Sequence, residues 1–142
     1  MCFLPIHLYD RDLPPETEAR QQAADIVNGR PHCRAVLIRK RSLENYLLND
    51  SIFEVSGIRI ELSDEDNVAD LVAEQLYRRQ EGPLPWQSLP PRTGKRRRNK
   101  AKLWLNTQAA DWMTPRRLAS WDPDGEVRSW LTTIARLANR RL

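Results

Sequence analysis

The sequence predicts an α/β domain with a small parallel β-α-β core, followed by a mostly helical C-terminal half. The first observation is a pair of short apolar segments, residues 3–9 and 33–38, that have the character of buried strands. Between them lies an amphipathic segment that opens with Pro14-Pro15 and ends with Asn28-Gly29, as helices often do. A helix between two strands predicts parallel pairing within one sheet. The third observation is that helical periodicity dominates the later part of the chain.

The predicted core continues with three further elements. Residues 43–48 predict a helical turn, and residues 58–62 alternate apolar and polar side chains as a strand does. Residues 64–79 carry apolar side chains at helical spacing, with Ser63 or Asp64 as the expected cap. Together these elements complete the predicted α/β part.

A proline-rich and basic segment separates the predicted core from the C-terminal part of the chain. Residues 82–98 are rich in proline and then in cations, which predicts a connector without regular structure. Helical periodicity returns after this segment. The expected organisation is therefore an α/β core over residues 1–81, the connector, and a helical part of the same domain over residues 99–142.

Three helices are expected in this last part. The first spans about residues 100–113, and Thr114-Pro115 then predicts a cap and a first-turn proline for a short helix. Asp122-Pro123 repeats the arrangement before the last helix. The apolar positions of that helix form the clearest amphipathic stripe in the chain: Val127, Trp130, Leu131, Ile134, Leu137 and Ala138. We expect this stripe to pack on the domain core.

Composition places the chain among ordinary globular domains. It has 142 residues, the length of one domain, and 23 basic against 19 acidic residues give a formal net charge of +4. The sequence contains neither an apolar run long enough to cross a membrane nor the pattern of a signal peptide. We therefore expect a cytoplasmic protein without a membrane partner.

Cations are concentrated in one segment of the chain, at residues 92–102. Seven lie within eleven residues: Arg92, Lys95, Arg96, Arg97, Arg98, Lys100 and Lys102. This density is typical of surfaces that bind a phosphate backbone, so DNA is the expected partner. A solvated loop or a protein interface is the competing interpretation. The tryptophans around this segment fall at helical spacing, which favours core packing over stacking on bases.

Three carboxylates follow the two predicted strands. Asp10 and Asp12 end the first strand, where alternation would place both side chains on one face about 7 Å apart. Glu44 follows the second strand, whose carboxyl end is expected at the same edge of the sheet. Carboxylates there would suit Mg²⁺ or Mn²⁺, which activate water for phosphate-ester hydrolysis. The simpler interpretation is that the aspartates form a turn or cap and that Glu44 is a solvated helix residue or an ion-pair partner.

The order of these motifs resembles the C-terminal part of the Toprim domain in nucleases of the OLD (overcoming lysogenization defect) type. The segments that carry the likeness are Asp10-Arg11-Asp12, Leu43-Glu44-Asn45-Tyr46-Leu47, Trp104-Leu105-Asn106, Met113-Thr114 and residues 122–131. The resemblance implies metal-dependent DNA cleavage, with Asp10, Asp12 and Glu44 as catalytic ligands of Mg²⁺ or Mn²⁺.

A catalytic lysine near the scissile phosphate is also implied by the resemblance. Lys100 fits that role best by its position before Trp104-Leu105, and Lys95 and Lys102 are the alternatives. Such a lysine would offset negative charge that builds on the phosphate. The resemblance further implies a role in prokaryotic defence or in a mobile element. An upstream or separate ATPase is then an expected partner. Whether the chain forms a homo-oligomer is left open.

The resemblance is incomplete at the N-terminal side. A complete Toprim domain begins with a strand that ends in a glutamate, whereas only nine residues precede Asp10 here. We therefore expect a partial Toprim-like core that is inactive, or nearly so, without an upstream ATPase and the first Toprim strand. The alternative is a non-catalytic protein that binds nucleic acid or a protein partner through residues 92–102. The retained carboxylates favour the nuclease, and the missing glutamate favours the alternative.

Overall fold

The computed structural model describes residues 6–139. Its N-terminal unit consists of β1 (Ile6–Tyr9), α1 (Glu16–Asn28) and β2 (Arg34–Leu37). The two strands pair in parallel, with Ile6 opposite Arg34 and Tyr9 opposite Leu37. The predicted β-α-β unit is therefore confirmed, although residues 3–5 of the first expected strand lie outside the described residues.

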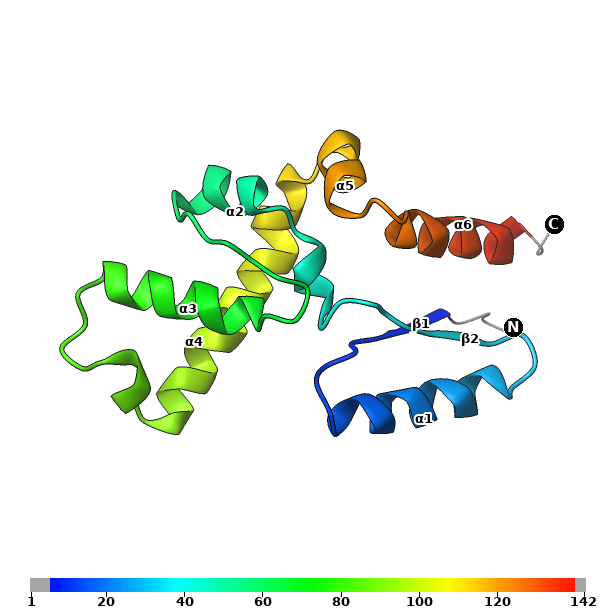
Figure 1. Cartoon of the computed structure of the whole chain (residues 1–142), viewed down its shortest axis with the longest axis horizontal. Helices are drawn as coiled ribbons and strands as arrows, with labels where there is room; N and C mark the ends of the chain where they lie inside the picture. Colours follow the sequence, from blue (N-terminus) through cyan, green and yellow to red (C-terminus); the bar gives the residue numbers. More distant parts are fainter. Residues whose placement is uncertain (1–5, 140–142) are drawn as a thin grey trace.

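Helices form most of the remaining described chain (Figure 1). The longer ones are α2 (Asn49–Ser56), α3 (Val68–Arg79), α4 (Pro91–Trp104), α5 (Pro115–Trp121) and α6 (Glu126–Asn139). Short 3₁₀ turns occur at Leu43–Tyr46, Trp86–Ser88 and Ala110–Trp112, and a π-helical turn, Leu105–Ala109, continues α4 directly. The fold is thus mixed α/β, with helix greatly exceeding strand.

Three expectations about local structure are wrong. Residues 58–62 form no strand; they run as irregular chain whose apolar side chains pack against the helical core. The basic part of the expected connector, from Pro91 onward, is helical, because Pro91 occupies the first turn of α4 and tolerates that position. The cap of α3 also differs: the Asn67 side chain, not Ser63 or Asp64, accepts a hydrogen bond from the Asp70 amide at 3.1 Å.

Three hydrophobic groups hold the described chain together. The largest joins α2, α3, α4 and the π-helical turn; its fully buried members are Ile52, Val68, Val72, Leu105 and Ala109. The two smaller groups lie at the sheet: one packs α1 against one face through Ala24 and Val27, and the other packs α6 against the opposite face (Figure 1). The sheet thus lies between two helices, beside a helical bundle.

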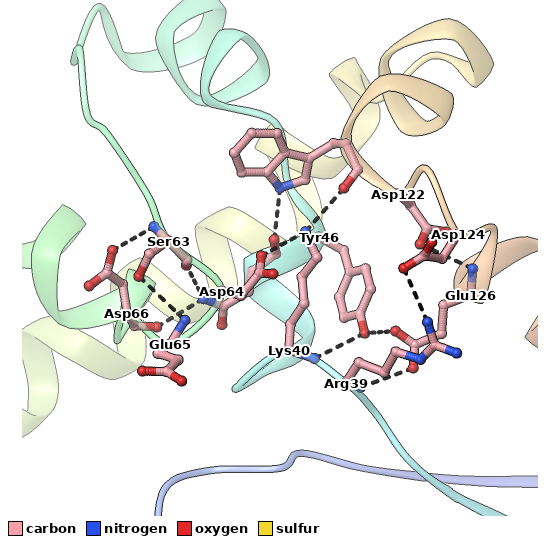
Figure 2. A network of polar contacts seen from close by, with 12 residues as sticks. Arg39, Lys40, Tyr46, Ser63, Asp64, Glu65, Asp66, Asp122, Asp124 and Glu126 are labelled. Atoms are coloured by element: carbon pink, nitrogen blue, oxygen red, sulfur yellow. Dashed lines mark hydrogen bonds and ion pairs between the residues drawn. The ribbon is translucent and has the colours of Figure 1, made fainter.

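A polar network attaches α6 to the segment that follows β2 (Figure 2). Tyr46 donates its hydroxyl hydrogen to the Glu126 carboxylate, and the Arg39 amide donates to the same carboxylate at 2.9 Å. The Asp122 carboxylate accepts hydrogen bonds from the Glu126 and Val127 amides at 3.0 and 2.8 Å, which caps α6. The network thus fixes the start of α6 against the sheet.

Lys40 is the partly buried cation of this network. Its ammonium forms an ion pair with Asp64 at 3.0 Å and donates to the Trp121 carbonyl at 3.0 Å (Figure 2). The same ammonium lies 5.2 Å from the centre of the Tyr46 ring and 4.8 Å from that of Trp121. With its charge and donors already satisfied, Lys40 connects α5 to the loop before α3 and has a structural role.

The amphipathic stripe of α6 packs only in part, contrary to expectation. Trp130 is buried against Ile38 and Tyr46, with its ring edge-on to the Tyr46 ring at a centroid distance of 5.1 Å. Leu131 and Ile134, from the same stripe, are 59% and 43% exposed. The two-stranded sheet is too narrow to cover the whole stripe, so only its N-terminal turns are anchored.

Replacing Trp130 by alanine should lower the free energy of unfolding by about 3–5 kcal/mol. The indole is 5% exposed and packs on Tyr46, so its removal leaves a cavity between α6 and the sheet. Urea denaturation would measure the change, with Trp112→Ala as control because that side chain is 48% exposed. Equal losses in the two variants would show that the Trp130 contact does not anchor α6.

Candidate functional site

Two of the expected carboxylates meet at the carboxyl end of the sheet. Asp10 follows β1 directly, and Glu44 lies in the 3₁₀ turn after β2. The two loops are tied together, because the Leu43 amide donates a hydrogen bond to Asp10 Oδ1 at 3.1 Å. The parallel pairing predicted from sequence is the reason that both strand exits reach one edge.

The end of α4 brings a cation and an amide to these carboxylates. The Lys102 ammonium lies 3.7 Å from Glu44 Oε1 and 4.0 Å from Asp10 Oδ2. Asn106 donates from Nδ2 to Glu44 Oε1 at 2.7 Å and to the Lys102 carbonyl at 2.9 Å. We call Asp10, Glu44, Lys102 and Asn106 the carboxylate–lysine cluster. Asn106 lies in the π-helical turn, a local distortion that is frequent at functional sites.

The two carboxylates of the cluster differ in their tendency to ionise. Glu44 is 2% exposed, and burial opposes its charge, but hydrogen bonds, chiefly from Asn106, and the charge of Lys102 together hold the pKa of Glu44 below its usual value. Burial raises the pKa of Asp10, and the neighbouring Glu44 and Asp12 charges add to that rise, while Lys102 opposes it. The cluster therefore holds more negative charge than Lys102 alone offsets.

Asp12 does not join the cluster. It pairs instead with Arg20 of α1, whose Nε lies 3.2 Å from Asp12 Oδ2. The expected alternation fails because β1 ends at Tyr9, and Asp12 adopts a left-handed backbone conformation with φ of 53°. Its amide donates to the Arg41 carbonyl at 2.9 Å, which holds this turn in place. The extended strand from which a shared face for Asp10 and Asp12 was predicted thus ends before both residues.

The lysine beside the carboxylates is Lys102 rather than Lys100, the residue that sequence position favoured. Residues two apart on a helix point about 200° away from each other, so the two lysines lie on opposite flanks of α4. Lys100 lines a groove with Arg79, Arg97 and Trp104 on the other flank. The structure therefore places Lys102, one of the alternatives to Lys100, beside Asp10 and Glu44.

The remaining cations of residues 92–102 have different surroundings. Arg98 pairs with Asp70 of α3, and Arg97 lies over the Tyr77 ring, 4.7 Å from its centre. Within residues 6–139, the three cations of the first turns form no ion pair: Arg92, Lys95 and Arg96. All three are exposed, and Lys95 lies on the same flank of α4 as Lys102. Exposed positive charge therefore runs along α4 toward the carboxylate–lysine cluster.

The cluster has the donor chemistry of a Mg²⁺ or Mn²⁺ site but an incomplete set of ligands. In the described part of the chain, no three carboxylate, imidazole or thiol groups are placed to hold one ion. Asp10 and Glu44 nevertheless converge on a single positive group, the Lys102 ammonium. Their oxygen atoms are the ligands that hard divalent cations prefer. Two carboxylates are fewer ligands than such an ion takes from a protein site, and the third candidate, Asp12, is paired with Arg20.

Sequence reasoning missed Asn106 and Arg20. The sequence presents Asn106 only within the Trp104-Leu105-Asn106 motif, although its spacing of four from Lys102 places both side chains on one helical flank. Arg20 carries no local signal, because its partner Asp12 is eight residues away and outside α1. Helical spacing could have identified the first residue, whereas only the folded chain reveals the second.

Comparisons with protein-family models, with curated proteins and with solved structures found no match to this chain. No helix among the described residues is both long and apolar enough to cross a bilayer.

Proposed function

We propose that this chain binds DNA along α4 and hydrolyses a phosphodiester bond at the carboxylate–lysine cluster. The observation that carries the proposal is the position of the Lys102 ammonium, 4.0 Å from Asp10 and 3.7 Å from Glu44, at the end of a helix rich in exposed cations. Such an arrangement offers a path for a phosphate backbone and, at its end, carboxylates that suit a catalytic cation. The resemblance to Toprim nucleases supports the same activity.

Each member of the cluster has a distinct role in this proposal. Asp10 and Glu44 would hold Mg²⁺ or Mn²⁺, which activates water and stabilises charge on the phosphate. Asn106 orients Glu44 through its hydrogen bond of 2.7 Å. The Lys102 side chain is 53% exposed, so its ammonium can turn from Glu44 toward a phosphate oxygen. Asp12, held by Arg20, contributes only if that ion pair opens.

Metal binding tests the proposed site directly. The wild-type chain should bind Mn²⁺ weakly, and Asp10→Ala or Glu44→Ala should abolish the binding measured by calorimetry. Asp12→Ala should leave it largely intact, because the Asp12 carboxylate faces Arg20. Unchanged Mn²⁺ binding after loss of both Asp10 and Glu44 would contradict the proposal. Loss of binding in Asp12→Ala would show instead that the ion pair opens and that Asp12 is a ligand.

DNA binding should depend strongly on salt concentration. If about five phosphates are contacted, the logarithm of the binding constant should fall against the logarithm of salt concentration with a slope of about −4 to −5. The combined change Arg92→Ala, Lys95→Ala and Arg96→Ala should make the slope shallower by about 2 to 3, because these exposed cations form no ion pair within residues 6–139. Fluorescence anisotropy with a labelled duplex would give the slope.

A charge-matched variant serves as control for this measurement. Arg30 and Arg34 lie before and at the amino end of β2, away from the cluster, and Arg136 lies in the last turn of α6. Alanine at these three positions removes the same net charge and should leave the slope almost unchanged. An equal effect of both triple variants would show that binding follows net charge and not the exposed face of α4.

A second candidate function is non-catalytic binding of nucleic acid or a protein partner through residues 92–102. The ion pair between Asp12 and Arg20 favours it, because this pair leaves the site with two converging carboxylates. This alternative predicts salt-dependent binding without Mn²⁺ binding or cleavage. An upstream or separate ATPase, expected from the resemblance, would be a partner under either function.

A further inference from the structure

A second positively charged site lies on the opposite flank of α4, in a groove between α3, α4 and the end of α2. The groove encloses about 360 Å³, within the range of about 300–1,000 Å³ that is usual for small-ligand sites. Its polar lining includes Arg79, Arg97 and Lys100, and its apolar walls include Leu76 and Trp104. It therefore combines three cations with an aromatic and aliphatic surface.

The two arginines of the groove are held in place by neutral partners. Arg79 donates from both terminal nitrogens to the Ser56 carbonyl, at 2.7 and 2.6 Å. Arg97 lies over the Tyr77 ring and donates to Gln80 Oε1 at 3.3 Å. Within residues 6–139, no carboxylate forms an ion pair with Arg79, Arg97 or Lys100. These contacts position the guanidinium groups while leaving their charge and several N–H donors available to an anion.

We propose that this groove binds a nucleotide, with Arg79, Arg97 and Lys100 around its phosphate and the base against Trp104 and Leu76. Forked guanidinium groups and an ammonium suit phosphate oxygens, and the half-buried indole offers an apolar face to a flat ring. An inorganic anion would use only the cations, and an apolar ligand only the walls. A nucleotide uses both the cations and the apolar walls. It is either a free nucleotide in solution or one residue of a nucleic-acid strand. The site is independent of cleavage at the carboxylate–lysine cluster.

Titration with adenosine 5′-monophosphate, followed by tryptophan fluorescence and calorimetry, tests this site. The nucleotide should bind at least about tenfold more tightly than adenosine or inorganic phosphate, because each of these lacks half of the contacts. Arg97→Gln combined with Lys100→Gln should weaken nucleotide binding at least about tenfold. Arg92→Gln with Arg96→Gln removes the same charge from the same helix, outside the groove lining, and should not.

The relative affinities distinguish binding in the groove from binding elsewhere on the basic surface of α4. Equal affinity for phosphate and nucleotide would overturn the base contact, and equal weakening by both double variants would overturn the groove as the site. Competition by the nucleotide against a thymidine oligonucleotide of about ten residues would identify a strand as the source. Nucleotide binding without such competition would identify a free nucleotide. Both of these results support the groove as the binding site. The Glu44→Gln variant should bind the nucleotide as the wild type does, even if this variant no longer binds Mn²⁺.

Discussion

Cleavage of DNA in Mn²⁺ is expected to fall at least about 100-fold when Glu44 is replaced by glutamine. Glutamine keeps the size of the side chain and can still accept the hydrogen bond from Asn106, so the local structure should survive. The variant removes the negative charge that lies 3.7 Å from the Lys102 ammonium and that would hold the metal ion. Nicking of supercoiled plasmid would measure the effect.

Cleavage by the wild-type chain alone is expected to be slow, because a two-metal site needs more ligands than Asp10 and Glu44 provide. Glu65→Gln is the matched control, since the Glu65 side chain is exposed and outside the cluster. Lys102→Gln should reduce cleavage, whereas Lys100→Gln should affect it less, because Lys100 lies on the other flank of α4. Undiminished nicking by Glu44→Gln would contradict the proposed site. Strong DNA binding with no cleavage by the wild type would favour the non-catalytic function.

Replacing Asn45 by alanine is expected to lower the free energy of unfolding by about 3 kcal/mol or more. Asn45 is 1% exposed, and its amide group is fully used. Its Oδ1 accepts from the Ser42 amide and hydroxyl at 2.9 and 2.7 Å, and its Nδ2 donates to the Ser63 and Asp66 carbonyls at 3.0 Å each. Alanine would leave these partners without the side chain that joins the turn of Glu44 to the loop before α3.

Urea denaturation followed by circular dichroism would measure this change. Asn99→Ala is the control, because Asn99 is exposed on α4 and alanine favours helix, so its stability should stay equal or rise slightly. Because Asn45 follows Glu44 directly, Asn45→Ala should also weaken Mn²⁺ binding. An unchanged denaturation midpoint for Asn45→Ala would show that the loop before α3 is held by other contacts.

The β-α-β unit could be predicted from the sequence because its signals are local. Apolar segments of strand length enclose an amphipathic helix, and a helical crossover returns the chain to the same end of the sheet, so the two strands run parallel. Parallel strands end at one edge, so the meeting of Asp10 with Glu44 also follows from the chain order. The cap and first-turn proline at Thr114-Pro115 likewise mark the start of α5 correctly.

The tertiary structure alone decided how the other site residues are arranged. The turn after β1 is held by the distant Arg41 carbonyl, and in it Asp12 pairs with Arg20. The face of α4 that packs on α3 sets the rotation of the helix and so presents Lys102, not Lys100, to the carboxylates. Composition identified residues 92–102 as basic, but the rotation of α4 divides these cations between the carboxylate–lysine cluster, Asp70 of α3, the groove between α3 and α4, and solvent. Sequence periodicity defines which residues share a helical face, whereas contacts between distant segments determine what that face meets.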